Sequence, residues 1–137
     1  MISTLKQVRM LHFAFITTWF LFLFLLRYLN PPEKPVAAFL LLALGVVCVS
    51  NIGLALFFRS RYLTSSAETL RAHPDDATAL ARWRVGNVLS FTFAETVTLF
   101  GVLLEFLGAG WRVSGIFFAV GLLLLVAWTP TPVSTAR

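Results

Sequence analysis

The sequence predicts an all-α membrane protein with four transmembrane helices, and two observations support this prediction. Of 137 residues, 58% are hydrophobic and only 12% are charged, whereas a soluble domain of this size carries about 25% charged residues. Four apolar runs also have roughly the length that crosses a bilayer as a helix. Little chain is left over, so we expect one membrane domain over residues 1–137, with spans at about 11–29, 36–58, 85–107 and 112–129.

The first span follows a short polar start that carries Lys6 and Arg9. A basic start before an apolar run also fits a signal peptide. This run is longer than a signal core, however, and it leads into the proline-rich turn Asn30–Pro35 rather than into small residues. We therefore expect a retained helix. The second span has small residues close to one face, which would let another helix approach closely: Ala38, Gly45, Cys48 and Ala55.

The segment 59–84 is the only sizeable polar part of the chain. Ser65–Glu68 has the spacing of a capping box, which predicts a short amphipathic helix from Ser65 to about His73. We expect Asp75 or Asp76 to cap the next helix, which continues without a breaker into the third span. The sequence thus predicts a short cytoplasmic helix between spans two and three, and a long third helix.

The basic residues predict the orientation of the chain in the membrane. Both termini and the long loop would share one side, which carries eight basic residues against three on the other side. By the positive-inside rule both termini are cytoplasmic, and we expect a bacterial inner (plasma) membrane. The eight are Lys6, Arg9, Arg59, Arg61, Arg71, Arg82, Arg84 and Arg137, and the three are Arg27, Lys34 and Arg112.

The third span carries two glutamates, Glu95 and Glu105. Glu95 lies eleven residues after Arg84, which places it about 16 Å into the membrane and close to the midplane. An ionised group there costs about 2.5–3.5 kcal/mol on insertion scales, and no span offers a basic residue at that depth. We therefore expect Glu95 to be neutral and hydrogen-bonded for much of the time. Glu105 falls near the opposite interface.

Small and polar residues form a stripe on one side of the third helix, at about 100° per residue. Such a stripe does not favour lipid, so it should face other helices or a hydrated cavity. We predict that it is an assembly face, together with Gly45 of the second span. The stripe consists of Asn87, Ser90, Ala94, Thr98, Gly101, Glu105 and Gly108.

The sequence Phe93-Ala-Glu-Thr-Val-Thr-Leu-Phe-Gly101 resembles the carboxylate helix of the rotor-ring proteolipid, the c subunit, of F- and V-type ATPases. Glu95 matches the ion-binding carboxylate of that family, and Leu99-Phe100-Gly101 matches the step that follows it. The resemblance implies a homo-oligomer in which Glu95 exchanges H+ or Na+. The candidate ion-binding residues are Glu95, Thr92, Thr98 and Asn51. The loop is longer than in that family, and further helices flank the hairpin.

Two other functions remain open. The chain would be a non-catalytic accessory subunit of a larger membrane complex if Glu95 were a buried structural residue bonded to Asn51, Thr92 or a backbone carbonyl. Small multidrug exporters also use four spans and one buried glutamate. They carry it in the first helix, where this chain has only His12, Thr17 and Thr18.

Several function classes lack the residues that they require. No catalytic triad pattern, phosphate-cradling glycine loop or CxxC motif is present, so we do not expect an enzyme. The single Cys48 excludes an intramolecular disulfide, and His12 and His73 lack a metal-ligand spacing. We expect His12 to be interfacial or hydrogen-bonded rather than a haem ligand. Outside the apolar runs, the sequence contains no basic stripe with interleaved aromatic residues, which is the pattern that would indicate nucleic-acid binding. The expected partners are the bilayer and other membrane subunits.

Overall fold

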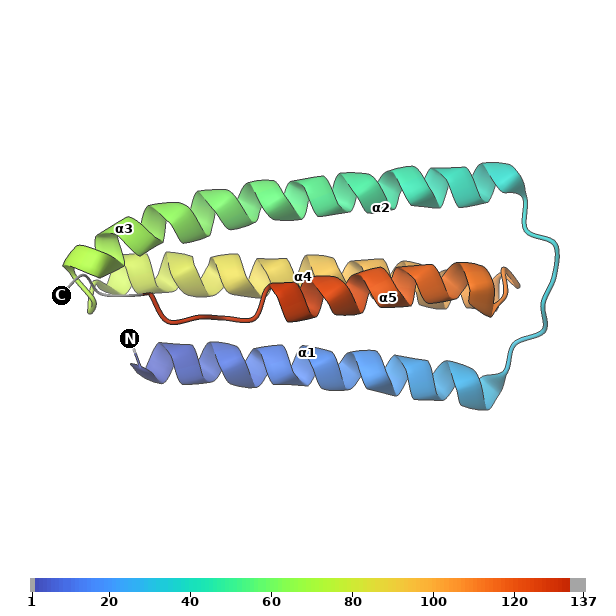
Figure 1. Cartoon of the computed structure of the whole chain (residues 1–137), viewed down its shortest axis with the longest axis horizontal. Helices are drawn as coiled ribbons and strands as arrows, with labels where there is room; N and C mark the ends of the chain where they lie inside the picture. The colour runs from blue at the N-terminus through green and yellow to red at the C-terminus, as the bar shows by residue number, and fades with distance from the viewer. Residues whose placement is uncertain (1, 134–137) are drawn as a thin grey trace.

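Four helical rods lie side by side in the computed structural model, which describes residues 2–133 (Figure 1). The second rod changes its helical type along its length, and over residues 2–133 no strand interrupts the bundle. The prediction of an all-α protein with four helices is therefore confirmed. The elements are α1 (Ile2–Leu29), α2 (Ala38–Arg59), the π-helix η1 (Ser60–Thr64), α3 (Ser65–Ala72), α4 (Ala77–Phe106) and α5 (Trp111–Ala127).

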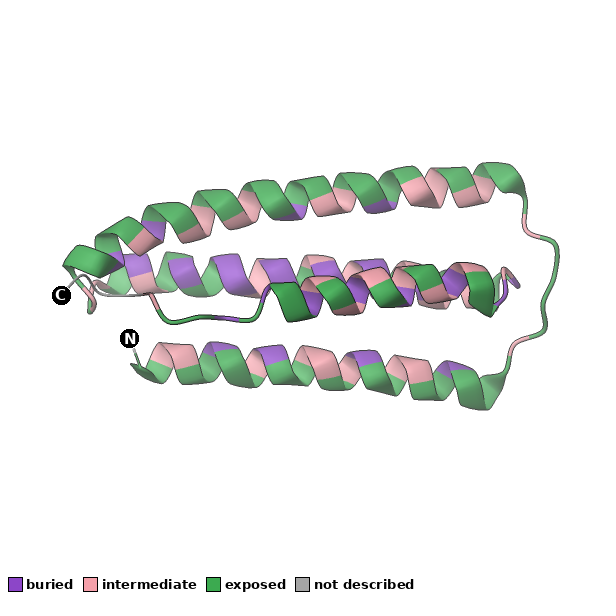
Figure 2. Ribbon diagram, viewed as in Figure 1, coloured by how far each residue is buried: buried purple, intermediate pink, exposed green. Residues whose placement is uncertain are grey.

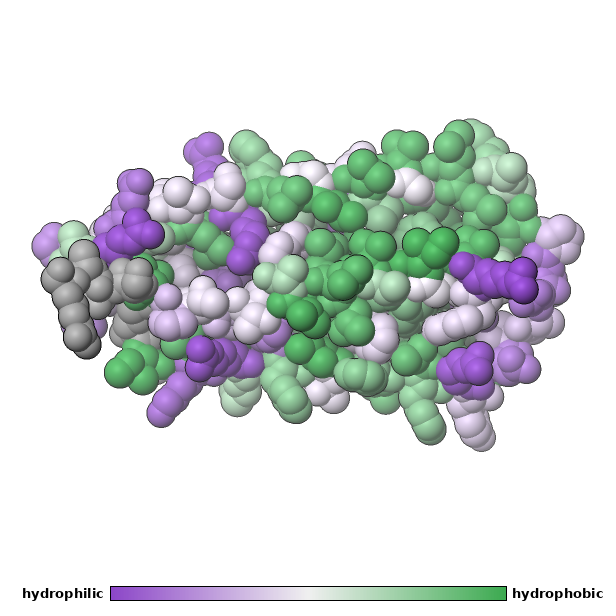
Figure 3. Space-filling model, in the orientation of Figure 1, coloured by the Kyte–Doolittle hydropathy of each residue, from purple (hydrophilic) through white to green (hydrophobic). Residues whose placement is uncertain are grey.

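Three of these rods are long and apolar enough to cross a membrane: Ile2–Leu29, Ala38–Ala72 and Ala77–Phe106. The fourth, α5, is apolar but has only 17 residues. On the face drawn in Figure 3, hydrophobic residues cover the middle of the bundle and hydrophilic residues gather towards its two ends. This distribution fits an integral membrane protein.

Helix α4 is the centre of the bundle, because it packs against α1, α2 and α5. Half of the residues in its apolar stretch are buried, against 11% in the rod that begins with α2 (Figure 2). Among the long helices that the structure describes, α2 contacts α4 alone, whereas α1 and α5 also contact each other. Most of the surface of α2 therefore faces outwards.

The predicted short helix is present as α3 (Ser65–Ala72), but the rod from α2 to α3 is continuous, so the capping role predicted for Ser65 is wrong. Ser65 has helical backbone angles (φ −64°, ψ −36°), and its hydroxyl donates to the carbonyl of Arg61 at 2.6 Å. The wider turn of η1 carries the helix through this segment, so no free N-terminus remains for Ser65 to cap. The prediction for the next helix is confirmed at Asp76, whose carboxylate accepts from the backbone N–H of Ala79 at 2.7 Å.

Two glycines close the connection at the far end of the bundle. Gly108 and Gly110 have positive φ angles of 93° and 77°, which favour glycine. A Cβ atom would lie 2.6 Å from the backbone nitrogen of Lys34 at Gly108, and 2.7 Å from Glu33 Oε1 at Gly110. The Lys34 N–H also donates to the Gly108 carbonyl at 2.9 Å. The turn between α4 and α5 is therefore fastened to the α1–α2 linker.

A tryptophan marks each end of α5. Trp111 begins the helix, and the guanidinium of Arg27 lies 5.6 Å from the centre of its ring. Trp128 follows the last helical residue, and Arg59 lies 5.6 Å from its ring centre. The first of these cation–π contacts joins α5 to α1, and the second joins the residue that follows α5 to the last residue of α2.

The chain after α5 continues in an irregular segment, Trp128–Val133, which runs from the end of α5 towards the end of the bundle where the N-terminus lies (Figure 1). Trp128 is buried and Pro130 is fully buried there. A proline has no backbone N–H, so Pro130 and Pro132 bring no unpaired donor into this position. The segment thus covers the N-terminal part of α4, which α5 does not reach.

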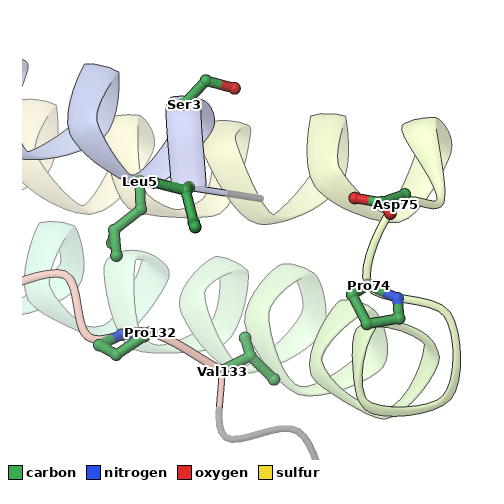
Figure 4. Close-up of a pocket in the computed structure, with 7 residues that line it drawn as sticks. Ser3, Leu5, Pro74, Asp75, Pro132 and Val133 are labelled. Atoms are coloured by element: carbon green, nitrogen blue, oxygen red, sulfur yellow. The ribbon is translucent and has the colours of Figure 1, made fainter.

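Both ends of the described chain meet at one end of the bundle. Figure 4 shows the pocket of 610 Å³ between them, where Pro132 and Val133 lie near Leu5 and Pro74. Met1 and Arg137 lie outside the described residues. The pocket is lined by Ile2, Ser3, Leu5, Pro74, Asp75, Pro132 and Val133.

Candidate ion-binding site

Glu95 lies on the side of α4 that packs against α1. One turn earlier, the ring of Phe91 contacts His12 and Phe15 of α1, with ring centres 4.8 and 5.9 Å apart. Residues four apart share a helix face, so Glu95 continues this face towards the middle of the bundle. Only 8% of Glu95 is exposed.

The Glu95 carboxyl has no hydrogen-bond partner among residues 2–133, although both of its oxygens are buried. The polar groups of α1 in this stretch are already occupied. Thr17 and Thr18 donate to carbonyls of their own helix, and the Trp19 indole N–H donates to the Phe118 carbonyl of α5 at 3.0 Å. Glu95 is therefore a buried polar group whose hydrogen-bonding capacity the described chain leaves unmet.

The structure places Asn51 on a different side of α4. Its side-chain amide donates to the Phe93 carbonyl at 2.9 Å, and the Phe93 ring stacks on Phe58 of α2 with centres 6.1 Å apart. Glu95 is two residues beyond Phe93, so its side chain leaves the helix about 160° round from that of Phe93. Asn51 thus joins α2 to α4 on the side away from the Glu95 carboxyl.

The two threonines proposed as co-ligands are bonded to their own helix. Thr92 is exposed, and its hydroxyl donates to the Val88 carbonyl at 3.0 Å. Thr98 is fully buried, and its hydroxyl donates to the Ala94 carbonyl at a long 3.5 Å. It lies three residues after Glu95, so their side chains leave the helix about 60° apart.

The small and polar stripe of α4 is largely buried inside this chain. Asn87, Ser90, Ala94, Thr98 and Gly101 are all buried. The Asn87 amide donates to the Trp83 carbonyl at 2.9 Å, and the Ser90 hydroxyl donates to the Gly86 carbonyl at 2.7 Å. The helix itself thus satisfies these polar groups.

Helix α5 packs closely over the C-terminal part of this stripe. A Cβ atom at Gly101 would lie 2.9 Å from the ring of Phe118, and one at Gly121 would lie 3.2 Å from the Ala94 carbonyl. The half-buried Glu105 accepts a hydrogen bond from the Ser114 hydroxyl of α5. The stripe is therefore a packing face within one chain, and the buried Gly108 ends it at the turn. This placement differs from the expected face between subunits.

The small face predicted for α2 is divided in the structure. Cys48 and Ala55 are buried, whereas Ala38 is exposed. Gly45 lies at the border, and a Cβ atom there would meet nothing within 4 Å. Part of this face is therefore covered within the chain, whereas Ala38 is exposed and Gly45 is half-buried.

His12 is hydrogen-bonded, as one of its two predicted roles required, and the sequence pattern does not identify its partner. Its Nε2 lies 2.7 Å from the Leu125 carbonyl, which is an acceptor, so Nε2 carries the proton. Leu125 is in the last turn of α5, where carbonyls lack partners within the helix. His12 therefore fastens α1 to the end of α5. Only the position of that helix end could have indicated this role.

Among residues 2–133, no group of three or more His, Cys, Asp or Glu side chains is placed to hold a metal ion. Comparisons of the sequence with protein-family models, with curated proteins and with solved structures gave no match.

Proposed function

We propose that this chain is an integral membrane protein in which Glu95 binds and releases a proton or a monovalent cation. It crosses the bilayer four times, with α5 as the fourth span and both termini on the cytoplasmic side. The length and apolarity of α1, α2 and α4 support the spans. The sequence has eight basic residues in the segments assigned to the cytoplasmic side, against three in the segments assigned to the other side, and this difference supports the orientation.

The unmet hydrogen-bonding capacity of the buried Glu95 carboxyl is the observation that carries this proposal. Leaving a buried polar group without a partner costs about 1–3 kcal/mol, and more if the group is charged. A chain with only a structural need at this position would be more stable with an apolar residue. A bound proton or cation, supplied with further ligands from outside the described chain, would relieve that cost.

The resemblance to the rotor-ring proteolipid supports the same role for Glu95. In the c subunit a carboxylate on a membrane helix, followed by an aliphatic-aromatic-Gly step, holds the ion, and Leu99-Phe100-Gly101 follows Glu95 here. The structure adds that Gly101 gives room to the ring of Phe118 of α5. Gly101 would thus also allow α4 and α5 to pack closely within the chain.

A homo-oligomer is part of the proposal, and the outward face of α2 is its contact surface. An added Cβ at Gly45 or Gly53 of α2 would meet no atom of residues 2–133 within 4 Å beyond the adjoining backbone of its own helix. Small residues let membrane helices approach closely. A helix of a second copy would then pack against the outward face of α2, as α1, α2 and α5 pack against α4 within the chain.

An accessory subunit of a larger membrane complex is the second candidate. The observation that favours it is the closure of the α4 stripe by α5 and the bonding of Asn51, Thr92 and Thr98 to backbone carbonyls. In that role Glu95 would receive its partner from a different protein at assembly, and it would exchange no ion.

Labelling with dicyclohexylcarbodiimide tests the role of Glu95, because this reagent attacks protonated carboxyl groups in apolar surroundings. We expect the purified protein to be labelled at Glu95, and the labelling rate to fall as pH rises or as Na+ is added. Glu95→Gln should abolish labelling. Glu105→Gln is the matched control, since Glu105 is on the same helix but bonded to Ser114. In this variant, labelling at Glu95 should persist.

Native mass spectrometry of the same samples distinguishes the two candidates. Homo-oligomers of the purified chain support self-association, whereas a single copy supports an accessory role. An unlabelled Glu95 in a well-folded protein, at every pH tested, would contradict ion exchange.

A further inference from the structure

A hollow of 430 Å³ lies between η1 and the beginning of α4, at the end of the bundle where the α2 rod leaves its apolar stretch. Two of its lining residues are arginines from different rods, Arg61 and Arg82, and the others are Tyr62 and Ser65. A volume of this size is within the range of small-ligand sites.

Gly86 is the reason that the two rods meet closely at this point. A Cβ atom at Gly86 would lie 2.8 Å from Tyr62 Cβ and 2.9 Å from a methyl carbon of Leu63. Gly86 is one turn after Arg82 on the same face of α4. The glycine therefore seats η1 on α4 and brings Arg61 and Arg82 to the same hollow.

The charges in this hollow are unbalanced. No carboxylate is among its lining residues, and neither guanidinium has a hydrogen bond or ion pair with residues 2–133. Two arginines in one hollow repel each other unless an anion lies between them. The planar guanidinium matches the oxygen geometry of phosphate, and the Tyr62 hydroxyl adds a further donor.

The depth of the hollow matches the phosphate layer of a bilayer. Arg82 is thirteen residues before Glu95, or about 20 Å along α4, whereas the hydrocarbon extends about 15 Å from the midplane. With Glu95 near the midplane, the two arginines lie just outside the hydrocarbon. The ring of Phe58, 6.3 Å from that of Tyr62, continues the surface towards the apolar part.

We propose that this hollow binds the phosphate of an anionic phospholipid through Arg61 and Arg82. The lipid headgroup neutralises both guanidiniums, and its acyl chains extend along the α2 side of the bundle. Basic pockets between membrane helices recognise anionic headgroups in this way. The site depends on the spanning arrangement of the chain and does not involve Glu95.

Native mass spectrometry of the full-length protein in detergent, titrated with phosphatidylglycerol or with phosphatidylcholine, tests this site. We expect one phosphatidylglycerol to bind more tightly than the rest. Affinity should fall about fivefold for Arg61→Gln or Arg82→Gln and about 30-fold for the double variant, since each arginine near the surface contributes about 1 kcal/mol. Phosphatidylcholine should show no such site.

The double variant Arg9→Gln with Arg84→Gln is the matched control. It removes the same charge near the same interface, and Arg84 leaves α4 on a different side from Arg82. It should bind phosphatidylglycerol as the native chain does, and so should Glu95→Gln. Circular dichroism and thermal unfolding check that every variant is folded.

Competition by inorganic phosphate distinguishes the source of the anion. Retention of phosphatidylglycerol in excess phosphate supports a lipid site, whereas displacement by phosphate at low concentration would overturn the lipid assignment in favour of a soluble phosphate. Equal phosphatidylglycerol binding by the native chain and the Arg61/Arg82 double variant would overturn the site itself.

Discussion

Helices α2 and α4 each contain two glycines, and these four residues have opposite surroundings. At Gly86 and Gly101 of α4, an added Cβ would lie within 3 Å of Tyr62 and Phe118 respectively. At Gly45 and Gly53 of α2 it would meet nothing within 4 Å. A glycine in a helix costs about 1 kcal/mol relative to alanine. Close packing inside the chain offsets this cost in α4 but not in α2, so a contact outside the chain is the better explanation for the α2 glycines.

The largest effect is expected where α4 is tightly packed. Gly101→Leu should reduce the free energy of unfolding by about 3 kcal/mol, because the new side chain would collide with Phe118 and with the Ser114 carbonyl at 3.0 Å. Unfolding by sodium dodecyl sulfate in mixed micelles measures this. Gly53→Leu is the control and should change stability by less than about 1 kcal/mol. Equal losses in both variants would remove the contrast between the helices.

Glu95 is the exception to the completed packing of α4. Glu95→Leu should raise the free energy of unfolding by about 2 kcal/mol, because it removes a buried carboxyl without a partner. Glu105→Leu should instead lower it by about 1 kcal/mol, because the Ser114 hydroxyl loses its bond to the carboxylate. The same unfolding assay compares them. Destabilisation by Glu95→Leu would indicate that Glu95 has a partner in the folded protein.

Loss of the contact between α1 and α5 is expected to change the free energy of unfolding by a smaller amount. His12→Leu should lower the free energy of unfolding by about 1.5 kcal/mol, because the Leu125 carbonyl at the end of α5 loses its donor. Thr17→Ala, at an exposed hydroxyl on the same helix, serves as the control. An unchanged stability in His12→Leu would show that this contact does not hold α1 to α5.

The smallest effect on stability, and the largest on assembly, is expected at the α2 face. Gly45→Leu with Gly53→Leu should leave the unfolding of the single chain within about 1 kcal/mol of the native value. It should shift the distribution of oligomers in native mass spectra. Phe39→Leu, at an exposed position of the same helix, is the control. An unaltered distribution would show that α2 is a lipid-facing helix.

The parts of the fold that depend on local patterns could be predicted from the sequence. Apolar run length predicted the long helices, and Asp76 was a recognisable cap because its carboxylate reaches a backbone N–H three residues later. The helix Ser65–Ala72 was predicted, but the capping role of Ser65 was predicted wrongly, because a capping box looks the same whether or not the preceding residues are already helical.

The surroundings of the candidate site could be predicted only in part. The position of Glu95 along the helix followed from its distance from Arg84. The identity of its neighbouring helix did not, because a four-helix chain has several packing arrangements with the same run lengths. The bond of Asn51 to the Phe93 carbonyl rather than to Glu95, and the closure of the α4 stripe by α5, depend on that arrangement.

In the proposed arrangement, with α5 as the fourth span, the short length of α5 has a consequence for the bilayer around the protein. Its 17 residues extend about 26 Å, whereas a typical hydrocarbon core is about 30 Å thick. The segment that follows α5 is not helical; Trp128 and Pro130 are buried in it, and its two prolines have no backbone N–H to leave unpaired. We expect the hydrocarbon to thin locally beside α5, so that its thickness matches the short apolar length of this helix. Hydrophobic mismatch would then favour residence of the protein in thin membranes. The bilayer would also be thinner beside α5 than beside the longer α2.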